Sequence, residues 1–323
     1  MSYLDYYRGK RVLVTGGTGS IGSEIVRQLA PIVSEVVVLS RSESKQSKLK
    51  NELRSKNVRF VIGDIRKLRT TVEACKNIDI VFHTAAMKHV DLCEENVAEA
   101  VETNLVGAEN VRWASNYRQV HRVVVISTDK AANPEGIMGM TKCIQERLFL
   151  NSADRSSSIV IVRMGNIIGS DGSVVWKFLS QKQNRVSLTI TSPEMIRFYM
   201  TVKEAGQLIL WAGAEAPDRS IAIRPMAAFR IMSLVVAMFG EKFADYVISG
   251  TRPGEKIEET LLTPKEMLNA DVVVVAANGI SKVVLVLPDN KGGPVPFSLS
   301  PYDWEIGIPV IRQMLTEAGV PIQ

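Results

Sequence analysis

VTGGTGSIGSE, residues 14–24, joins a short apolar run to a longer amphipathic one. Gly16 permits a tight turn, Gly19 lets backbone amides approach a pyrophosphate, and Gly22 lets a helix pack closely on a strand. A strand, a glycine loop and a helix in this order are typical of a dinucleotide-binding unit. The loop therefore predicts cofactor contacts at Gly16, Thr18, Gly19, Ser20, Ile21 and Gly22.

The first half of the 323-residue chain alternates Val- and Ile-rich runs with amphipathic ones. We expect strands at residues 11–15, 35–39, 58–62, 78–83, 122–127 and 159–163. We expect helices at residues 20–30, 43–55, 69–76, 94–116 and 137–151. This alternation predicts an α/β fold with a doubly wound, Rossmann-like parallel sheet. We place that domain at residues 1–165 and a smaller C-terminal substrate-binding domain at residues 166–323, with some of its segments returning to the first sheet.

Composition excludes several classes of protein. The chain is 46% hydrophobic and 23% charged, which is ordinary globular usage and excludes a disordered protein. Its net charge of +5 is dispersed, with no accompanying aromatic pattern, which argues against a nucleic-acid partner. No apolar run spans a bilayer and no signal-peptide pattern opens the chain, so we expect a cytoplasmic protein. The three cysteines and three histidines lack zinc-site spacing, and we expect no metal.

The end of the second expected strand indicates which dinucleotide binds. Arg41 stands where an NAD enzyme carries an acid for the ribose hydroxyls. An arginine there, together with Lys45, suits a 2′-phosphate, so NADP is favoured. The alternative is that both cations belong to a solvated helix start. Further cofactor contacts are expected at the ends of the second, third and fourth strands, at Ser40, Asp64, Ile65, Ala85 and Ala86.

Eight motifs together resemble the UDP-N-acetylglucosamine 4,6-dehydratases of the polysaccharide-biosynthesis group, within the extended short-chain dehydrogenase/reductase superfamily. They are TGGTGSIGSE, GDIR, HTAAMKHVD, STDKAANP, MGMTK, RMGNIIGSDGSV, RFYMT and RPGEK, spread over residues 8–263. STDKA with RPGEK is far more specific than the glycine loop. The resemblance implies a redox-neutral cycle: NADP takes hydride from carbon 4 of UDP-N-acetylglucosamine, water is eliminated, and the hydride returns to carbon 6.

The same resemblance implies roles for the residues that follow the fifth strand. Lys130 is the base at carbon 5, and Asp129 is the acid that protonates the departing hydroxyl of carbon 6. Thr128 hydrogen-bonds the reacting oxygen, and Lys142 binds the nicotinamide ribose. To act as a base Lys130 needs a lowered pKa, which we expect from burial and from the Lys142 charge.

Met138 occupies the position where the superfamily carries a tyrosine base. A thioether cannot exchange a proton, so two interpretations compete. Either the chain binds nucleotides without catalysis, as an NADP-binding regulatory protein, or Asp129, Thr128 or Lys142 handles that proton through water. We expect activity because the acid, base and lysine set is intact. A UDP-sugar 4-epimerase is the close enzymatic alternative, since it needs only reversible oxidation at carbon 4.

The resemblance also implies a substrate side and a partner. Lys88 faces the sugar or the nicotinamide. Arg197 and Arg252 clamp the diphosphate and uridine, because a guanidinium binds phosphate oxygens in a bidentate fashion. The helix at residues 94–116 pairs with a neighbouring subunit in related enzymes, so we expect a homo-oligomer. The remaining substrate contacts are expected at Asn166, Ser173, Val174 and Glu255.

Overall fold

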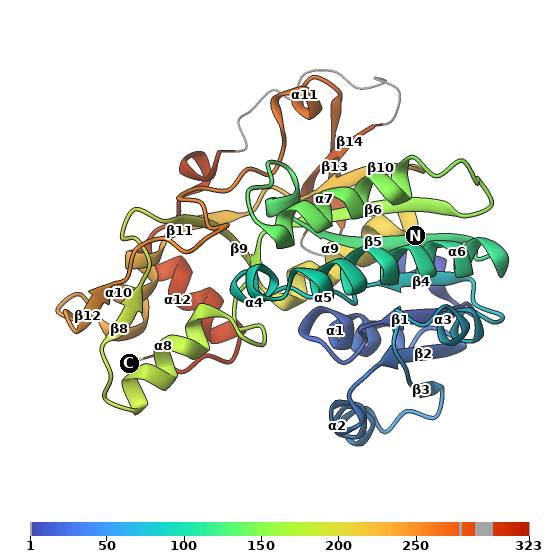
Figure 1. The fold of residues 1–323 in the computed structure, drawn as a ribbon, viewed down its shortest axis with the longest axis horizontal. Helices are drawn as coiled ribbons and strands as arrows, with labels where there is room; N and C mark the ends of the chain where they lie inside the picture. The colour runs from blue at the N-terminus through green and yellow to red at the C-terminus, as the bar shows by residue number, and fades with distance from the viewer. Residues whose placement is uncertain (1, 278–279, 288–299, 323) are drawn as a thin grey trace.

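A nine-stranded sheet forms the centre of the computed structural model, which describes residues 2–277, 280–287 and 300–322 (Figure 1). The strand order is β13-β14-β10-β6-β5-β4-β1-β2-β3. All pairs from β3 to β10 are parallel, while β14 and β13 are antiparallel to their neighbours. The bounds are β1 Arg11–Thr15, β2 Glu35–Ser40, β3 Val58–Ile62, β4 Ile80–His83, β5 Arg122–Thr128, β6 Ser158–Met164, β10 Ser220–Ile223, β13 Ala270–Ala277 and β14 Ile280–Val286. The predicted doubly wound parallel sheet is confirmed, and strands from beyond residue 165 extend it.

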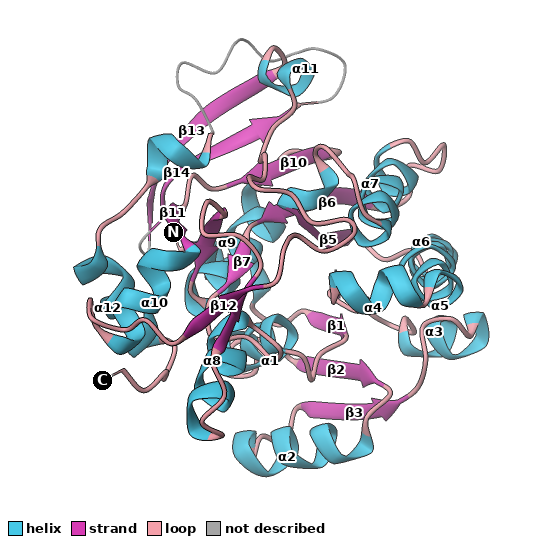
Figure 2. Cartoon of the chain, turned by 60° about the vertical axis from the view of Figure 1, so that its left-hand side comes forward, coloured by secondary structure: helices cyan, strands magenta, loops and turns pink. Residues whose placement is uncertain are grey.

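Helices cover both faces of this sheet, which is why the middle residues of its central strands are apolar on both faces. Helices α3 and α6 pack together on one side, where α7 also lies, and α1 packs against α9 on the other (Figure 2). The core that they enclose includes Val14, Phe82 and Val124. The bounds are α1 Ser20–Leu29, α2 Glu43–Leu53, α3 Leu68–Ala74, α6 Gly107–Tyr117, α7 Ile137–Leu150 and α9 Val202–Glu215.

The helix expected at residues 94–116 is wrong as a single element. The backbone leaves the helical region at Asn96, with φ −129° and ψ 60°, and the Asn96 side-chain amide donates to the Leu92 carbonyl. A π-helical segment then precedes α6. The spacing of apolar residues does not reveal the break at Asn96, because Cys93 and Ala100 on either side of it belong to one hydrophobic cluster, and a π-helical turn has no sequence signal of its own. The segments are α4 Val90–Glu95, α5 Val97–Val101 and the π-helical Glu102–Val106.

The smaller elements gather at one end of the molecule, on the left of Figure 1. They have a second hydrophobic core that includes Phe178, Leu234 and Leu315. Among the described residues, no helix is both long and apolar enough to cross a membrane. The strands are β7 Asn166–Ile167, β8 Leu188–Ile190, β9 Ile196–Met200, β11 Ala227–Arg230 and β12 Tyr246–Ile248. The helices are α8 Val174–Gln183, α10 Ile231–Phe239 and α12 Ile308–Glu317, and α11 Pro264–Met267 lies by β13. The 3₁₀ helices that the structure describes include η1 Tyr3–Tyr7, η3 Asp129–Ala131 and η5 Pro301–Trp304.

Candidate active site

A cavity of about 840 Å³ lies at the carboxyl edge of the parallel sheet. Residues that directly follow β1 and β4 line it, at the point where the strand order reverses. Ligands of open α/β sheets bind at this point. Its far wall is formed by residues of β7, α8 and β9. Asp129 is the one predicted site residue that does not line it. Those that do are Gly16, Thr18, Gly19, Ser20, Ile21, Gly22, Ser40, Arg41, Lys45, Asp64, Ile65, Ala85, Ala86, Lys88, Thr128, Lys130, Met138, Lys142, Asn166, Ser173, Val174, Arg197, Arg252 and Glu255.

The glycine loop gives this cavity a wall that fits a pyrophosphate. Gly16 adopts a φ of +66°, and a Cβ there would lie 2.7 Å from the Ala85 backbone, so only glycine lets the two loops approach. Helix α1 begins after Gly19 without a side-chain cap. The amides of its first turn are therefore available to an anion. These features suit the diphosphate of a dinucleotide.

Cations and acids alternate along the rim beside β2 and β3. Arg41 lines the cavity and forms no ion pair with any residue that the structure describes. The Lys45 ammonium lies 2.8 Å from a carboxylate oxygen of Asp171. Asp64 is bound by Arg66, whose guanidinium is 2.7 Å away. Of the two cations predicted to meet a 2′-phosphate, one is therefore already paired.

Lys130 lies on the cavity wall at the turn that follows β5. Its ammonium is 2.9 Å from the Asp129 carboxylate and 3.5 Å from that of Glu259. Its side chain is 17% exposed, whereas Asp129 is fully buried. The Thr128 hydroxyl donates to the same oxygen of Asp129 at 2.8 Å, and the other oxygen has no hydrogen-bond partner in the described part of the chain. Asp129 thus lies behind Lys130 and Thr128.

The expected lowering of the Lys130 pKa is wrong. Burial does lower the pKa of Lys130, but the carboxylates of Asp129 and Glu259 raise it by more, so that it lies above its ordinary value. The buried Glu259 follows the RPGEK motif and was not predicted; its second oxygen is 2.9 Å from the Lys256 ammonium. Lys256 also donates to the Asn133 carbonyl at 2.6 Å. The segment after RPGEK therefore binds directly beneath the Lys130 turn.

Lys142 and Met138 line the cavity one turn apart on α7. The buried Lys142 ammonium donates to the Ile126 carbonyl at 2.5 Å. Burial lowers the pKa of Lys142 to about 8, against an opposing effect of the Glu146 carboxylate. An amine that titrates near neutrality is suited to proton transfer. The thioether of Met138 is not.

Asn104 was not predicted, yet it positions the loop that carries Lys88. The Asn104 side chain accepts from the Met87 amide at 2.7 Å and donates to the Met87 carbonyl at 3.0 Å. It also donates to the Thr141 hydroxyl at 3.0 Å. The π-helical turn is what places this amide toward the loop, and no local pattern in the sequence marks such a turn. Lys88 in turn donates to the Asp171 carbonyl at 2.6 Å.

The N-terminus of α8 forms a second wall suited to anions. Helix α8 begins after Ser173 without a side-chain cap, and Val174 is its first residue. The Ser173 hydroxyl is buried and has no hydrogen-bond partner among the described residues. Both residues line the cavity, as the glycine loop does. An unpartnered donor at an uncapped helix start is a good environment for phosphate oxygens.

The two predicted arginine clamps differ in what they bind. The buried Arg197 guanidinium donates to the carbonyls of Lys256 and Ile257 at 2.5 and 2.7 Å. Arg197 thereby fixes the segment that places Glu259 beside the Lys130 turn. Arg252 is more exposed, and within the described ranges its guanidinium pairs only with the Asp91 carboxylate, at 3.4 Å. Between the two, Arg252 is the cation more open to a ligand, and the clamp role of both stays a prediction.

Comparison with known proteins extends this picture. Residues 12–276 match the polysaccharide biosynthesis protein family. A UDP-glucose 4-epimerase from Rickettsia felis is 36% identical over 274 residues, which cover 81% of this chain and 80% of the relative. The X-ray structure of Pen from Bacillus thuringiensis is 33% identical, with a TM-score of 0.89 over 98% of this chain and 99% of that one.

A more distant structure shares only the fold. The dTDP-glucose 4,6-dehydratase DesIV from Streptomyces venezuelae, solved with NAD and TYD bound, is 22% identical, with a TM-score of 0.68 over 79% of this chain and 89% of that one. It supports the Rossmann-like assignment made from the glycine loop. The match over most of the sequence, together with the relatives above 30% identity, shows that the chain belongs to the polysaccharide biosynthesis protein family.

Proposed function

We propose that the protein is an NADP-dependent hydro-lyase, a UDP-N-acetylglucosamine 4,6-dehydratase that forms a UDP-2-acetamido-2,6-dideoxy-4-keto-hexose. The observation that carries this proposal is Lys130 on the wall of a cavity that the glycine loop and the α8 N-terminus also line, with the paired Asp129 carboxylate buried behind it. The glycine loop suits the dinucleotide, and the α8 N-terminus suits the diphosphate of a nucleotide sugar. When bound, the nicotinamide supplies a hydride acceptor and donor. Arg41 supports NADP over NAD.

The Lys130–Asp129 pair also provides the protons for water elimination. With its raised pKa, Lys130 is an ammonium at neutral pH and cannot accept the proton of carbon 5. The nearest acceptor for its own proton is the Asp129 oxygen at 2.9 Å. Transfer within the pair leaves a neutral amine and a carboxylic acid. The amine then removes the carbon 5 proton, and the acid returns a proton to the departing carbon 6 hydroxyl through the Thr128 hydroxyl, which contacts Asp129 and lines the cavity.

Lys142 replaces the missing tyrosine as the base at the carbon 4 hydroxyl in this proposal. Only the unprotonated amine accepts a proton, so the oxidation rate should rise with pH through about 8 and then level off. Lys142→Arg, whose guanidinium stays protonated, should lose roughly a hundredfold in rate together with this pH dependence. Single-turnover rates across pH test this. Adding Met138→Tyr to the Lys142→Arg variant restores a phenol and should recover part of the rate. An unchanged pH profile in Lys142→Arg would remove Lys142 from this role.

A second candidate function is a UDP-sugar 4-epimerase. The Rickettsia relative named UDP-glucose 4-epimerase favours it, and its reaction needs only reversible oxidation at carbon 4. The buried Asp129 and its lysine have no assigned task in that reaction. A non-catalytic NADP-binding regulatory protein is the third possibility, since Met138 stands on the cavity wall.

One experiment separates all three. The protein is incubated in heavy water with NADP and, in parallel, UDP-N-acetylglucosamine or UDP-glucose, and the sugar is followed by NMR. A dehydratase yields a 6-deoxy-4-keto sugar with deuterium at carbon 5. An epimerase yields the galacto product without deuterium at carbon 5, and a regulatory protein leaves both substrates intact. A galacto product alone would overturn the dehydratase assignment.

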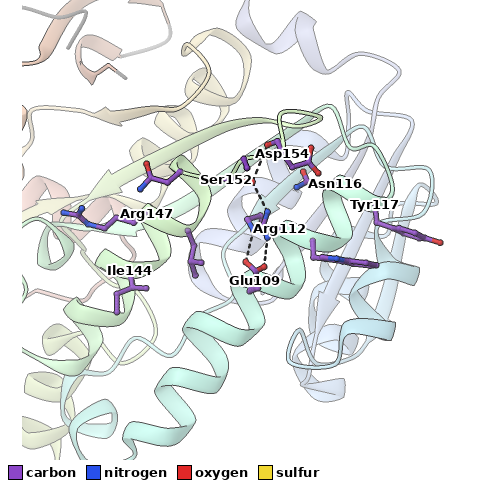
Figure 3. A pocket seen from close by; sticks show the side chains of 12 residues that line it. Glu109, Arg112, Asn116, Tyr117, Ile144, Arg147, Ser152 and Asp154 are labelled. Atoms are coloured by element: carbon purple, nitrogen blue, oxygen red, sulfur yellow. Dashed lines mark hydrogen bonds and ion pairs between the residues drawn. The ribbon is translucent and has the colours of Figure 1, made fainter. Parts of the chain in front are cut away.

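We also propose a homo-oligomer, built on the exposed faces of α6 and α7. The rings of Trp113 and Tyr117 stack with their centroids 5.0 Å apart, and the two residues are 43% and 61% exposed. Both line a surface depression of about 800 Å³, which Ile144 also lines (Figure 3). Aromatic patches of this kind are typical of protein interfaces. Trp113→Glu should therefore lower the mass measured by size exclusion with light scattering. Val247→Glu, at a 52% exposed apolar residue of β12, is the control that should keep the wild-type mass. Equal masses for both variants would reject this interface.

A further inference from the structure

The turn between β7 and α8 is hydrogen-bonded to the dinucleotide side of the cavity through Asp171. Its backbone amide donates to the Ser20 hydroxyl at 3.0 Å, at the start of α1. Its carbonyl accepts from the Lys88 ammonium at 2.6 Å, in the loop after β4. Its carboxylate binds the Lys45 ammonium at 2.8 Å, in the first turn of α2. All four residues line the cavity.

Only one of these three contacts is made by the carboxylate of Asp171, although its charge also acts on Lys88. The hydrogen bonds to Ser20 and Lys88 use backbone atoms and remain when the side chain becomes asparagine. The carboxylate, in contrast, neutralises Lys45, one of the two cations beside the end of β2. A 2′-phosphate carries up to about two negative charges at neutral pH, so it would both need Lys45 and be repelled by Asp171. NAD, whose ribose lacks that phosphate, neither needs Lys45 nor is repelled by Asp171.

We propose that Asp171 is a specificity-determining residue for the cofactor, because its carboxylate competes with a 2′-phosphate for Lys45 and weakens the binding of NADP relative to NAD. The inference rests on the proposed dinucleotide site. It assigns the choice of cofactor to a residue more than a hundred positions beyond β2, where such choices are usually made. Arg41, without an ion pair among the described residues, favours the phosphate, and Asp171 opposes it. The protein should therefore bind both NADP and NAD, with only a modest difference between the two affinities.

Direct binding measurements test this without any need for turnover. Dissociation constants of NADP⁺ and NAD⁺ are measured by calorimetry for the wild type, for Asp171→Asn and for Asp245→Asn. Asp245 is the matched control, since its exposed carboxylate accepts from the Ser187 hydroxyl away from the cavity. Asp171→Asn should bind NADP⁺ roughly five- to tenfold more tightly and NAD⁺ within about twofold of the wild type. Asp245→Asn should change neither constant.

A third variant separates competition for Lys45 from a general effect on the turn. Lys45→Met should weaken NADP⁺ and leave NAD⁺ nearly unchanged, and Asp171→Asn on that background should tighten NADP⁺ by a smaller factor than it does alone. Equal shifts for both dinucleotides in Asp171→Asn, or an unchanged NADP⁺ constant, would overturn the assignment of Asp171. A wild-type protein that binds neither dinucleotide would overturn the proposed function itself, and this inference with it.

Discussion

Lys130→Arg is expected to abolish deuterium incorporation at carbon 5 of the sugar, with a loss of roughly 10²–10⁴-fold in the exchange rate. Arginine keeps the positive charge beside Asp129 and Glu259, so the ion pairs that hold this turn survive. It does not release its proton at any pH compatible with the fold. The variant therefore separates the base role of Lys130 from its structural role. NMR of the sugar in heavy water measures the effect.

Two further measurements make this test decisive. Lys130→Ala removes the charge as well as the base, and it should lose exchange to the same extent while also losing stability, because the buried Asp129 carboxylate loses its cation and Glu259 loses one of its two. Dinucleotide binding should be unchanged within about twofold in Lys130→Arg, since Lys130 pairs with Asp129 and Glu259 and not with a residue of the glycine loop in the described part of the chain. Exchange that persists in Lys130→Arg would exclude Lys130 as the base.

Sequence reasoning located the cavity because the relevant residues are local to strand ends. Gly16 to Gly22, Ala85 and Lys130 each follow a strand of the parallel sheet directly, and the carboxyl ends of such strands meet at one edge. Periodicity likewise placed β1 and β3 at their observed bounds. The bounds of a strand depend mainly on residues that are neighbours in the chain.

The contacts that the sequence did not reveal join residues that are far apart in the chain. Glu259 acts on Lys130 across more than a hundred residues, and Asp171 meets Lys45 across a similar separation. Neither carboxylate differs in its local pattern from the exposed acids around it. The pKa of Lys130 was predicted in the wrong direction for the same reason. Burial was foreseeable from the motif, whereas the second carboxylate came from a segment whose position no local signal fixes.

Arg163 supports the second large prediction, which concerns stability. It lies at the end of β6 and is 1% exposed. Its guanidinium is 2.6 Å from the Glu146 carboxylate on α7 and 2.9 Å from that of Glu266 on α11, and it donates to the Leu261 carbonyl at 2.8 Å. This one side chain therefore joins the sheet to the segment that carries Glu259. Arg163→Met removes the only cation paired with these carboxylates within the described residues, and it should lower the free energy of unfolding by about 3–5 kcal/mol.

The pH dependence of stability distinguishes a lost ion pair from a lost packing contact. In the wild type, burial raises the pKa of Glu266 but Arg163 lowers it by more, so it lies below its ordinary value of 4.5. The stability that this provides is present above pH 4.5 and is lost as the pH falls through the folded-state pKa. In Arg163→Met burial is opposed only by the two hydrogen bonds that Glu266 accepts from Thr263, so the pKa of the carboxyl rises above its wild-type value and the variant should lose less stability than the wild type as the pH falls.

Thermal unfolding across pH measures both effects, with an expected fall in Tm on the order of 10 °C at neutral pH that narrows in acid. Arg230→Met is the control, because Arg230 pairs with Glu194 and Glu305 at the surface and such pairs contribute about 0–1 kcal/mol. Adding Glu146→Gln and Glu266→Gln to Arg163→Met removes both orphaned charges, and this triple variant should recover much of the loss. If instead it unfolds at the same temperature as Arg163→Met at every pH, the stabilisation comes from the packing of the arginine stem and not from its charge.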